Sequence, residues 1–263
     1  GRALLALRTG AAGVERLHEL LEAQAFRLAY WRVAFDEINY RRFFDVNDLA
    51  ALRMEHAPAF EATHRYVLDL AASGMIDGLR IDHPDGLYDP AAYFGQVQEG
   101  YARRAGLACE ASDRPVYLVV EKIIAPHEDL PEAWPVHGTT GYRYANTVNG
   151  VLVDTESRAR IDRTWRAFAG TEATDFELAA YQGRRAMLRG PLAAGLTVLA
   201  SQALHLARSD RRTRDHTLAS LRQGLEEIAG SFPVYRTYVS AEGASPQDRR
   251  YIDWAVARAR QRS

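Results

Sequence analysis

The strongest constraint on the fold is a continuous apolar run at residues 115–120, which reads Pro-Val-Tyr-Leu-Val-Val. A run of this length, rich in β-branched residues and without polar alternation, is typical of a strand buried on both faces of a parallel sheet. Parallel strands need long crossover connections, which are usually helical. The run therefore predicts an α/β fold.

Helical patterns flank this strand. Apolar positions at spacings of three and four predict helices at residues 14–34, 59–73 and 90–104. A second strand is predicted at residues 76–82, and a turn with the sequence His-Pro-Asp-Gly closes it. This order is the βαβ alternation of an α/β protein, in which the crossovers are right-handed.

The second half of the chain has a different pattern. From residue 154 onward the periodicity predicts mostly helices, and a strand is expected only at residues 234–239. Ser245, Pro246 and Asp248 predict the start of the last helix, as N-cap, first-turn proline and capping-box acid. We expect these helices to pack on the α/β half as an elaboration of it. The helices are predicted at residues 155–169, 174–189, 191–208, 215–229 and 246–263.

The charge balance excludes several classes of partner. The chain has 33 Lys and Arg against 34 Asp and Glu, for a net charge of -1, so neither nucleic acid nor an anionic membrane surface is an expected partner. The uncharged run at residues 190–207 is interrupted by proline and polar residues, and predicts a buried helix rather than a membrane span. The eight histidines are scattered, so no metal ion or other cofactor is predicted.

The cysteine count and the first residues bear on location and completeness. Cys109 is the single cysteine and cannot form an internal disulfide, and no secretory leader pattern follows Gly1, so a cytoplasmic location is expected. The chain begins without Met, and we expect it to be a piece of a longer protein.

Two carboxylates, Asp82 and Glu121, follow the two predicted strands. In parallel α/β folds, side chains at the carboxyl ends of the strands point into a shared crevice where ligands bind. Arg80 lies on the same strand face as Asp82 and is expected to keep it ionised, whereas Glu121 has no such neighbour on its strand and is expected to stay protonated. A retaining glycosidase divides the work between its carboxylates in this way, at a separation of about 5 Å. A structural ion pair between Arg80 and Asp82 is the alternative interpretation.

Several strings resemble glycoside hydrolase family 13, the α-amylase superfamily. The sequence Gly-Leu-Arg-Ile-Asp at residues 78–82 matches the nucleophile strand of that superfamily, and Val-Val-Glu at residues 119–121 resembles its acid/base strand. Longer strings that resemble its maltooligosyl trehalose synthase branch lie at residues 36–50, 80–87, 137–142, 210–215 and 232–238.

The resemblance implies a partial (β/α)8 TIM barrel of the α-amylase type with a large, mainly helical insertion. Residues 1–153 would form the central part of the catalytic barrel, and residues 154–263 would form the inserted subdomain. The sequence lacks the early Asp-x-x-x-Asn-His motif and the third catalytic Asp of that family, and Gly86 stands where the superfamily has a His four residues after the nucleophile. We therefore expect barrel strands beyond both ends of this chain.

The implied activity is an intramolecular transglucosylation in trehalose biosynthesis. The reducing-end α-1,4 linkage of a maltooligosaccharide would become an α,α-1,1 linkage by a retaining double displacement, with Asp82 as nucleophile and Glu121 as acid and base. The expected pathway partner is a maltooligosyl trehalose trehalohydrolase. The candidate substrate-binding residues are Arg80, His83, Asp85, Lys122, Thr140 and Tyr142.

Most of these candidates also have a structural interpretation. His83 and Asp85 are placed for sugar hydroxyls, but the Pro-Asp-Gly string is also a plain turn. Lys122 would bind a hydroxyl, modulate the neighbouring acid or point outward. Thr140 and Tyr142 lie in a glycine-flanked loop that could instead cap a helix, and Tyr142 could stack on a glucose face.

Two further functions stay open. An α-1,4-glucan hydrolase or a 4-α-glucanotransferase of the same superfamily would share Arg80, Asp82 and Glu121, so that only the product distinguishes them. A non-catalytic carbohydrate-binding fragment is the alternative from another class, since a binding module does not need the third carboxylate.

Overall fold

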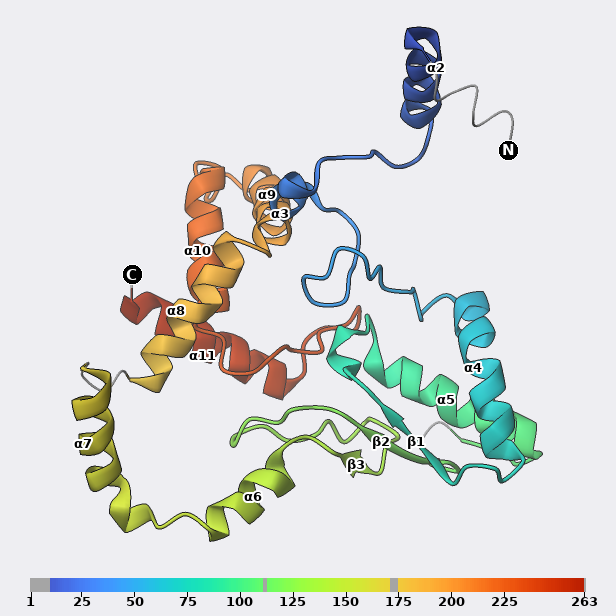
Figure 1. Cartoon of the computed structure of the whole chain (residues 1–263), viewed down its shortest axis with the longest axis vertical. Helices are drawn as coiled ribbons and strands as arrows, with labels where there is room; N and C mark the ends of the chain where they lie inside the picture. The colour runs from blue at the N-terminus through green and yellow to red at the C-terminus, as the bar shows by residue number, and fades with distance from the viewer. Residues whose placement is uncertain (1–9, 111–112, 171–174, 263) are drawn as a thin grey trace.

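The structure is a computed structural model of the 263-residue chain, and it describes residues 10–110, 113–170 and 175–262. In the described residues, helices predominate and a small parallel sheet lies among them (Figure 1). The α-helices are α2 (Ala11–Glu22), α3 (Ala34–Glu37), α4 (Ala57–Ala72), α5 (Pro90–Ala105), α6 (Arg143–Val151), α7 (Arg158–Ala169), α8 (Phe176–Arg189), α9 (Ala193–Ser209), α10 (Leu218–Gly230) and α11 (Pro246–Arg262). The short 3-10 helices are η1 (Trp31–Val33), η2 (Pro84–Gly86) and η3 (Thr155–Ser157).

The sheet has three parallel strands in the order β1 (Gly78–Ile81), β2 (Tyr117–Val120) and β3 (Gly138–Thr139). In this register, Ile81 lies opposite Val120, and Val120 lies opposite Thr139. The carboxyl ends of the three strands therefore lie side by side, and the residues that follow them share one edge of the sheet.

Helices α4 and α5 cover the sheet and form the main core with it. Phe94 and Val97 of α5 are fully buried together with Leu118 and Val120 of β2. Sequence periodicity sets this arrangement, because α4 and α5 each place an apolar stripe toward the strands. The run at residues 115–120 is buried on one side only, since the Tyr117 residue is 56% exposed.

The buried side-chain amide of Gln98 connects α5 to the chain segments that precede β2 and β3. Its side-chain nitrogen donates to the carbonyls of Val116 (3.1 Å) and Pro135 (2.9 Å), and its oxygen accepts from the Val116 N–H at 3.0 Å. Backbone groups that enter the core before β2 are satisfied in this way, which fixes the strand against α5.

The last four helices form a second packed region, in which α10 contacts α8, α9 and α11 (Figure 1). An ion network joins α8 to α10, where Arg185 and Arg189 each donate to the buried Glu226 carboxylate at 2.8 Å. The predicted capping box of α11 is confirmed. The Ser245 hydroxyl donates to the Asp248 carboxylate at 2.6 Å and accepts from the Asp248 N–H at 3.1 Å.

One predicted element is wrong, one is confirmed only in part, and helices α3 and α6 and strand β3 were not predicted. The helix predicted at residues 14–34 is observed as α2, which ends at Glu22, and most of the apolar positions that follow are exposed. Residues 234–239 are extended without a ladder partner, so the predicted strand does not form. Helix α6 has an amphipathic pattern from which it could have been predicted, whereas the two-residue strand β3 is too short to show one.

Helix α9 confirms a helix in the uncharged run at residues 190–207, but only part of it is buried. Leu196 and Ala200 face the interior, while Leu199 and Leu206 are exposed. Within the described residues, no helix taken singly is long and apolar enough to cross a membrane. Helices α8 and α9 meet that criterion only as a pair bent by 81°.

Candidate functional site

The carboxyl edge of the sheet carries three polar residues, one after each strand. Asp82 follows β1, Glu121 follows β2 and Thr140 follows β3, and we call these three the strand-end row. Backbone hydrogen bonds extend the ladder to this level, since the Glu121 N–H donates to the Ile81 carbonyl and the Thr140 N–H donates to the Val120 carbonyl, both at 2.8 Å. The strand ends thus bring the two predicted catalytic carboxylates next to each other, as the sequence predicts.

Arg80 connects the two outer members of the strand-end row. Its Nη1 donates to Asp82 Oδ1 and its Nε donates to Thr140 Oγ1, both at 2.9 Å. Because β2 lies between β1 and β3, the Arg80 side chain passes across the end of the middle strand. The predicted pairing of Arg80 with Asp82 is confirmed. The side chains are 47% and 66% exposed, so this edge is open to a ligand.

His83 adopts a strained backbone conformation directly after Asp82. Its φ of 45° lies in the left-handed region, which costs a non-glycine residue of order 1–3 kcal/mol. This conformation directs the His83 N–H toward Glu121, whose Oε2 accepts it at 3.3 Å. The imidazole packs against Phe44, with ring centroids 4.7 Å apart, and fills the space beside Gly86, where a Cβ would lie 2.8 Å from the ring.

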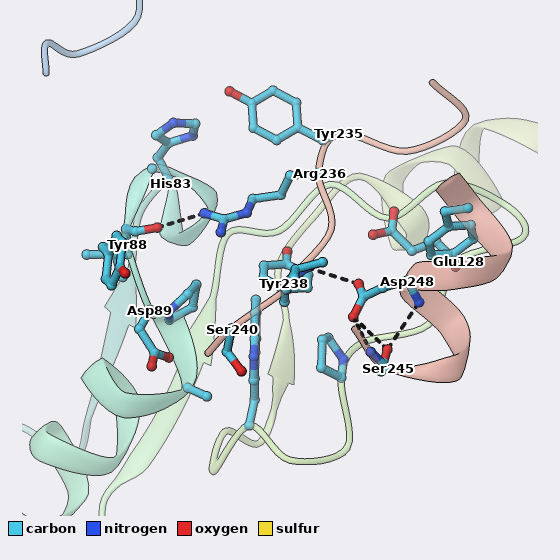
Figure 2. Close-up of a pocket in the computed structure, with 18 of the residues that line it drawn as sticks. His83, Tyr88, Asp89, Glu128, Tyr235, Arg236, Tyr238, Ser240, Ser245 and Asp248 are labelled. Atoms are coloured by element: carbon cyan, nitrogen blue, oxygen red, sulfur yellow. Dashed lines mark hydrogen bonds between the residues drawn. The ribbon is translucent and has the colours of Figure 1, made fainter. Parts of the chain in front are cut away.

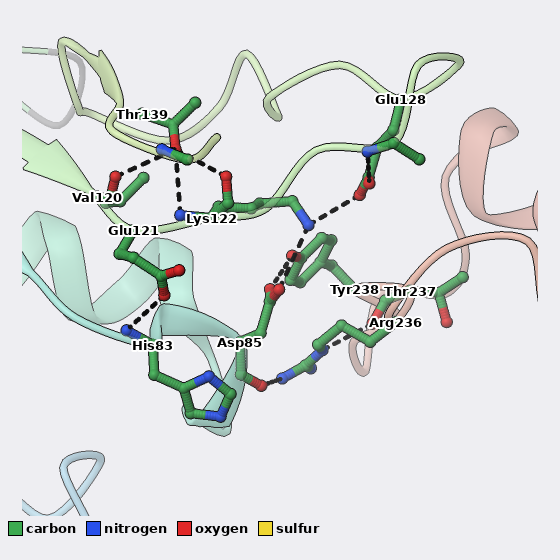
Figure 3. Close-up of polar contacts among 12 residues, drawn as sticks. His83, Asp85, Val120, Glu121, Lys122, Glu128, Thr139, Arg236, Thr237 and Tyr238 are labelled. Carbon is green, nitrogen blue, oxygen red and sulfur yellow. Dashed lines mark hydrogen bonds and ion pairs between the residues drawn. The ribbon is translucent and has the colours of Figure 1, made fainter. Parts of the chain in front are cut away.

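Beneath the strand-end row lies a cluster of charged residues whose side chains are almost wholly buried. Lys122 is 0% exposed, and its Nζ lies 2.8 Å from Glu128 Oε1 and 3.4 Å from Asp85 Oδ2 (Figure 3). The Tyr238 hydroxyl donates a short hydrogen bond to the other oxygen of Asp85. We call Asp85, Lys122, Glu128 and Tyr238 the buried ion cluster. Its charges are paired and hydrogen-bonded, as buried charges must be.

Burial of the Tyr238 phenol raises its pKa far above the ordinary value, and the negative charge of the Asp85 carboxylate raises this pKa further. The phenol therefore stays protonated at neutral pH and donates to Asp85. Arg236, on the same segment as Tyr238, donates from Nη1 to the carbonyls of Asp85 (2.8 Å) and Leu87 (2.7 Å). Residues 236 and 238 thus hold the η2 turn from the far end of the chain.

Thr139 joins the loops that follow β2 and β3. Its hydroxyl donates to the Lys122 carbonyl at 2.7 Å and accepts from the N–H groups of Lys122 (3.1 Å) and Gly141 (3.0 Å). Gly141 is required here, because a Cβ at this position would lie 2.3 Å from the Lys122 carbonyl oxygen.

A cavity of about 1370 Å³ opens beside the edge, between the η2 turn with the start of α5 and the segment that leads into α11 (Figure 2). His83, Tyr235 and Arg236 line it, and so does Asp248 at the N-terminus of α11. Asp82 is not among its lining residues, and neither is Glu121. His83 connects the strand-end row to the cavity, because its backbone N–H bonds to Glu121 and it also lines the cavity.

The structure separates the predicted site residues into three groups. Arg80, Asp82, His83, Glu121 and Thr140 come together at the edge of the sheet. Tyr142 stands at the start of α6 and is 61% exposed. Asp85 and Lys122 lie in the buried ion cluster, where their charged groups bond to protein.

Three residues of this region carry no predicted site role, namely Glu128, Arg236 and Tyr238. The last two lie in the string at residues 232–238, whose resemblance to the family was the only available signal. Their partners are about 150 positions away in the sequence, so spacing alone could not reveal them. In the described residues, no three His, Cys, Asp or Glu side chains are arranged to hold a metal ion.

Comparison with known proteins identifies relatives of the chain. No family model matches the sequence. Curated proteins from two strains of Mycobacterium tuberculosis, named as maltooligosyl trehalose synthases, are 38% identical to it over 138 residues, which are 52% of this chain and 16% of the relative.

Solved structures match over almost the whole chain. The maltooligosyltrehalose synthase from Arthrobacter ramosus superposes with a TM-score of 0.73 and 32% identity, over 94% of this chain and 29% of that one. The DSM5389 glycosyltrehalose synthase gives a TM-score of 0.68 and 29% identity, over 91% of this chain and 28% of that one. This chain therefore spans less than a third of the length of these relatives. Over the matched residues, the chain is similar in sequence and in fold to maltooligosyl trehalose synthases.

Proposed function

We propose that this chain carries part of the catalytic site of an intramolecular transglucosylase. The enzyme converts the reducing-end α-1,4 linkage of a maltooligosaccharide into an α,α-1,1 linkage. The observation that carries the proposal is the adjacency of Asp82 and Glu121 at register-paired strand ends, with Arg80 bonded to Asp82. The homology with maltooligosyl trehalose synthases selects this reaction among those that two carboxylates can catalyse.

In the first step, Asp82 attacks the anomeric carbon of the penultimate glucose. The bond from that carbon to the O4 of the terminal glucose breaks, and Glu121 gives its proton to O4. The maltooligosyl chain is then held as an ester on Asp82. Arg80 orients the attacking carboxylate through the 2.9 Å bond to Oδ1.

In the second step, the released glucose stays in the site and turns. Glu121 takes the proton from its anomeric hydroxyl, and that oxygen attacks the anomeric carbon of the maltooligosyl chain, so that the bond from this carbon to Asp82 breaks and the α,α-1,1 linkage forms. No water is consumed. Water must be kept from the ester, because its attack would give hydrolysis.

The remaining predicted residues divide into contact and support. Thr140 and Tyr142 contact sugar from the exposed side of the edge, and His83 orients Glu121 through its backbone N–H. We assign Asp85 and Lys122 a role beneath the site, because their charged groups are buried and paired.

The same homology supports proposals on architecture and pathway. We infer that β1, β2 and β3 belong to a (β/α)8 barrel, of which residues 1–153 supply the central part, with residues 154–263 as a helical insertion. The substrate is a maltooligosaccharide. A maltooligosyl trehalose trehalohydrolase would consume the product.

The test is an NMR time course of maltopentaose with the full product of the reading frame that contains this chain. Loss of reducing-end anomeric signals without matching free glucose is expected. The Asp82→Asn and Glu121→Gln variants should each lose turnover by at least about 10³-fold. Tyr66→Phe on α4, which is exposed and outside the site, is the matched control and should retain full turnover.

The products separate the alternatives. Accumulation of glucose and shorter maltodextrins would replace the isomerase by a hydrolase or glucanotransferase that uses the same carboxylates. Binding of maltopentaose without any product would favour a carbohydrate-binding module. Full turnover by either carboxylate variant would remove that residue from the mechanism.

A further inference from the structure

We propose that the buried ion cluster positions the two catalytic carboxylates relative to each other, with Lys122 at its centre. The inference rests on the proposed function, in which Asp82 and Glu121 act together. It assigns Asp85, Lys122, Glu128 and Tyr238 as positioning residues.

The cluster joins the two loops that carry the carboxylates. Lys122 is the residue after Glu121, and Asp85 lies three residues after Asp82 in the loop that follows β1. The Lys122 to Asp85 ion pair therefore links the two loops directly behind the strand-end row (Figure 3). A shift of either loop would stretch this pair.

The segment before α11 fixes the cluster from a third direction. Tyr238 bonds to the Asp85 carboxylate, and Arg236 bonds to the carbonyls on both sides of Gly86. The Tyr238 N–H in turn donates to Asp248 at 3.0 Å. The position of the η2 turn, and with it the His83 N–H that faces Glu121, is thus set by residues of the helical half.

Stability alone is a weak reason for such a cluster. Buried ion pairs are often replaceable by neutral side chains of similar volume without loss of stability, because desolvation offsets the attraction between the charges. Their directional contacts instead favour one arrangement of the groups that they join. Catalytic groups need placement within about 0.5 Å, which such contacts supply.

The experiment compares three variants of the full product of the reading frame. Lys122→Met removes the central charge and should lower kcat about 10- to 100-fold, with KM within about twofold of the wild type. Lys122→Met/Asp85→Asn/Glu128→Gln removes all three charges, and should regain the melting temperature that Lys122→Met loses while kcat stays low. Glu226→Gln disrupts the distant ion network between α8 and α10, and should lower the melting temperature with kcat unchanged.

A second measurement does not depend on activity. Amide hydrogen exchange should become faster at residues 82–87 and 236–238 in Lys122→Met and in the neutral triple variant, and stay unchanged there in Glu226→Gln. If the wild type hydrolyses or transfers glucan instead of isomerising it, the kcat of that reaction is compared between the wild type and the variants. If the wild type has no activity, the proposed function fails, and the exchange measurement alone decides whether the cluster holds the loops.

Three results would overturn the proposal. The first is an unchanged kcat in Lys122→Met. The second is recovery of kcat together with the melting temperature in the triple variant, which would make the cluster a stability element only. The third is unchanged exchange at residues 82–87 in both cluster variants.

Discussion

The strand-end row and the buried ion cluster each take an aspartate and a glutamate from the loops that follow β1 and β2, yet they lie in opposite environments. The Asp82 side chain is 66% exposed and pairs with a half-exposed arginine, whereas the Asp85 side chain is 8% exposed and pairs with a lysine that solvent does not reach. Glu121 faces the open edge, and Lys122, the next residue, points into the interior.

The difference shows how one short stretch of chain can supply both reactivity and rigidity. Successive residues of an extended chain point to opposite faces, so a carboxylate aimed at substrate is followed by a side chain aimed at the protein. Exposed charges cost little to keep and remain available for chemistry. Buried charges are costly unless they are paired, so they bind the loops together.

The sharpest test of this comparison replaces one carboxylate of the strand-end row and one of the buried ion cluster by the corresponding amides. Glu128→Gln leaves the buried Lys122 ammonium without its nearest partner and should lower the free energy of unfolding by about 3–5 kcal/mol. Asp82→Asn, the matched change at the exposed edge, should alter it by no more than about 0.5 kcal/mol. Urea unfolding of both variants measures the difference. Equal losses of unfolding free energy would show that burial does not make the carboxylates of the cluster more important for stability than those of the strand-end row.

A glycine substitution sharpens the comparison at the junction of the loops. Gly141→Ala should destabilise the protein by about 1–3 kcal/mol, because its Cβ would lie 2.3 Å from the Lys122 carbonyl oxygen. Gly150→Ala in α6 is the control, since no atom lies within 4 Å of its Cβ, and helix propensity should make it neutral or stabilising. Thermal unfolding of the two variants should separate them clearly, and a fully stable Gly141→Ala protein would contradict the close approach.

The contact from α11 to the cluster has its own pH signature. Burial acts to raise the pKa of Asp248, but hydrogen bonds from the Ser245 hydroxyl and the Tyr238 N–H outweigh it and hold the pKa below its ordinary value. The stabilisation is therefore complete above the unfolded-state pKa and is lost as pH falls through the lower folded-state value.

Asp248→Asn tests this linkage. The variant should be less stable than the wild type by about 1 kcal/mol at pH 6, and the difference should shrink when urea unfolding is repeated near pH 3. The Asp253→Asn variant on the exposed face of α11 serves as the control and should show no loss at pH 6. A difference that grows as the pH falls would have the wrong sign.

A small effect on stability is expected at Arg80. Its pair with Asp82 is about half exposed, so Arg80→Ala should cost no more than about 1 kcal/mol of unfolding free energy. Turnover of maltopentaose should nevertheless fall about tenfold or more, because Asp82 and Thr140 lose their common partner. Unchanged turnover would show that the pair is only structural.

Local patterns predicted the elements that build the site. The apolar run at residues 115–120, the short strand before Asp82 and the periodic stripes of α4 and α5 all correspond to observed elements. Because parallel strands end at one edge, the neighbourhood of Asp82 and Glu121 followed from these elements alone. The Asp248 capping box was likewise visible, since its partner Ser245 is three residues away.

Contacts between distant segments were not predictable in the same way. Residues 234–239 have the alternation of a strand, but they bind side chains and turn carbonyls instead of a ladder. The two residues of β3 become a strand only because β2 offers unpaired backbone groups beside them. The helix predicted at residues 14–34 is only partly observed, since α2 ends at Glu22.

The sequence by itself determined which residues end the strands and therefore which carboxylates share an edge, since a period of two or of 3.6 residues is a local property. Only the tertiary structure decided that Asp85 and Lys122 are buried while Asp82 is open, and that Tyr238 lies against Asp85 from 153 positions away. Burial and pairing of charges depend on what the rest of the chain places around them, and no local pattern encodes that.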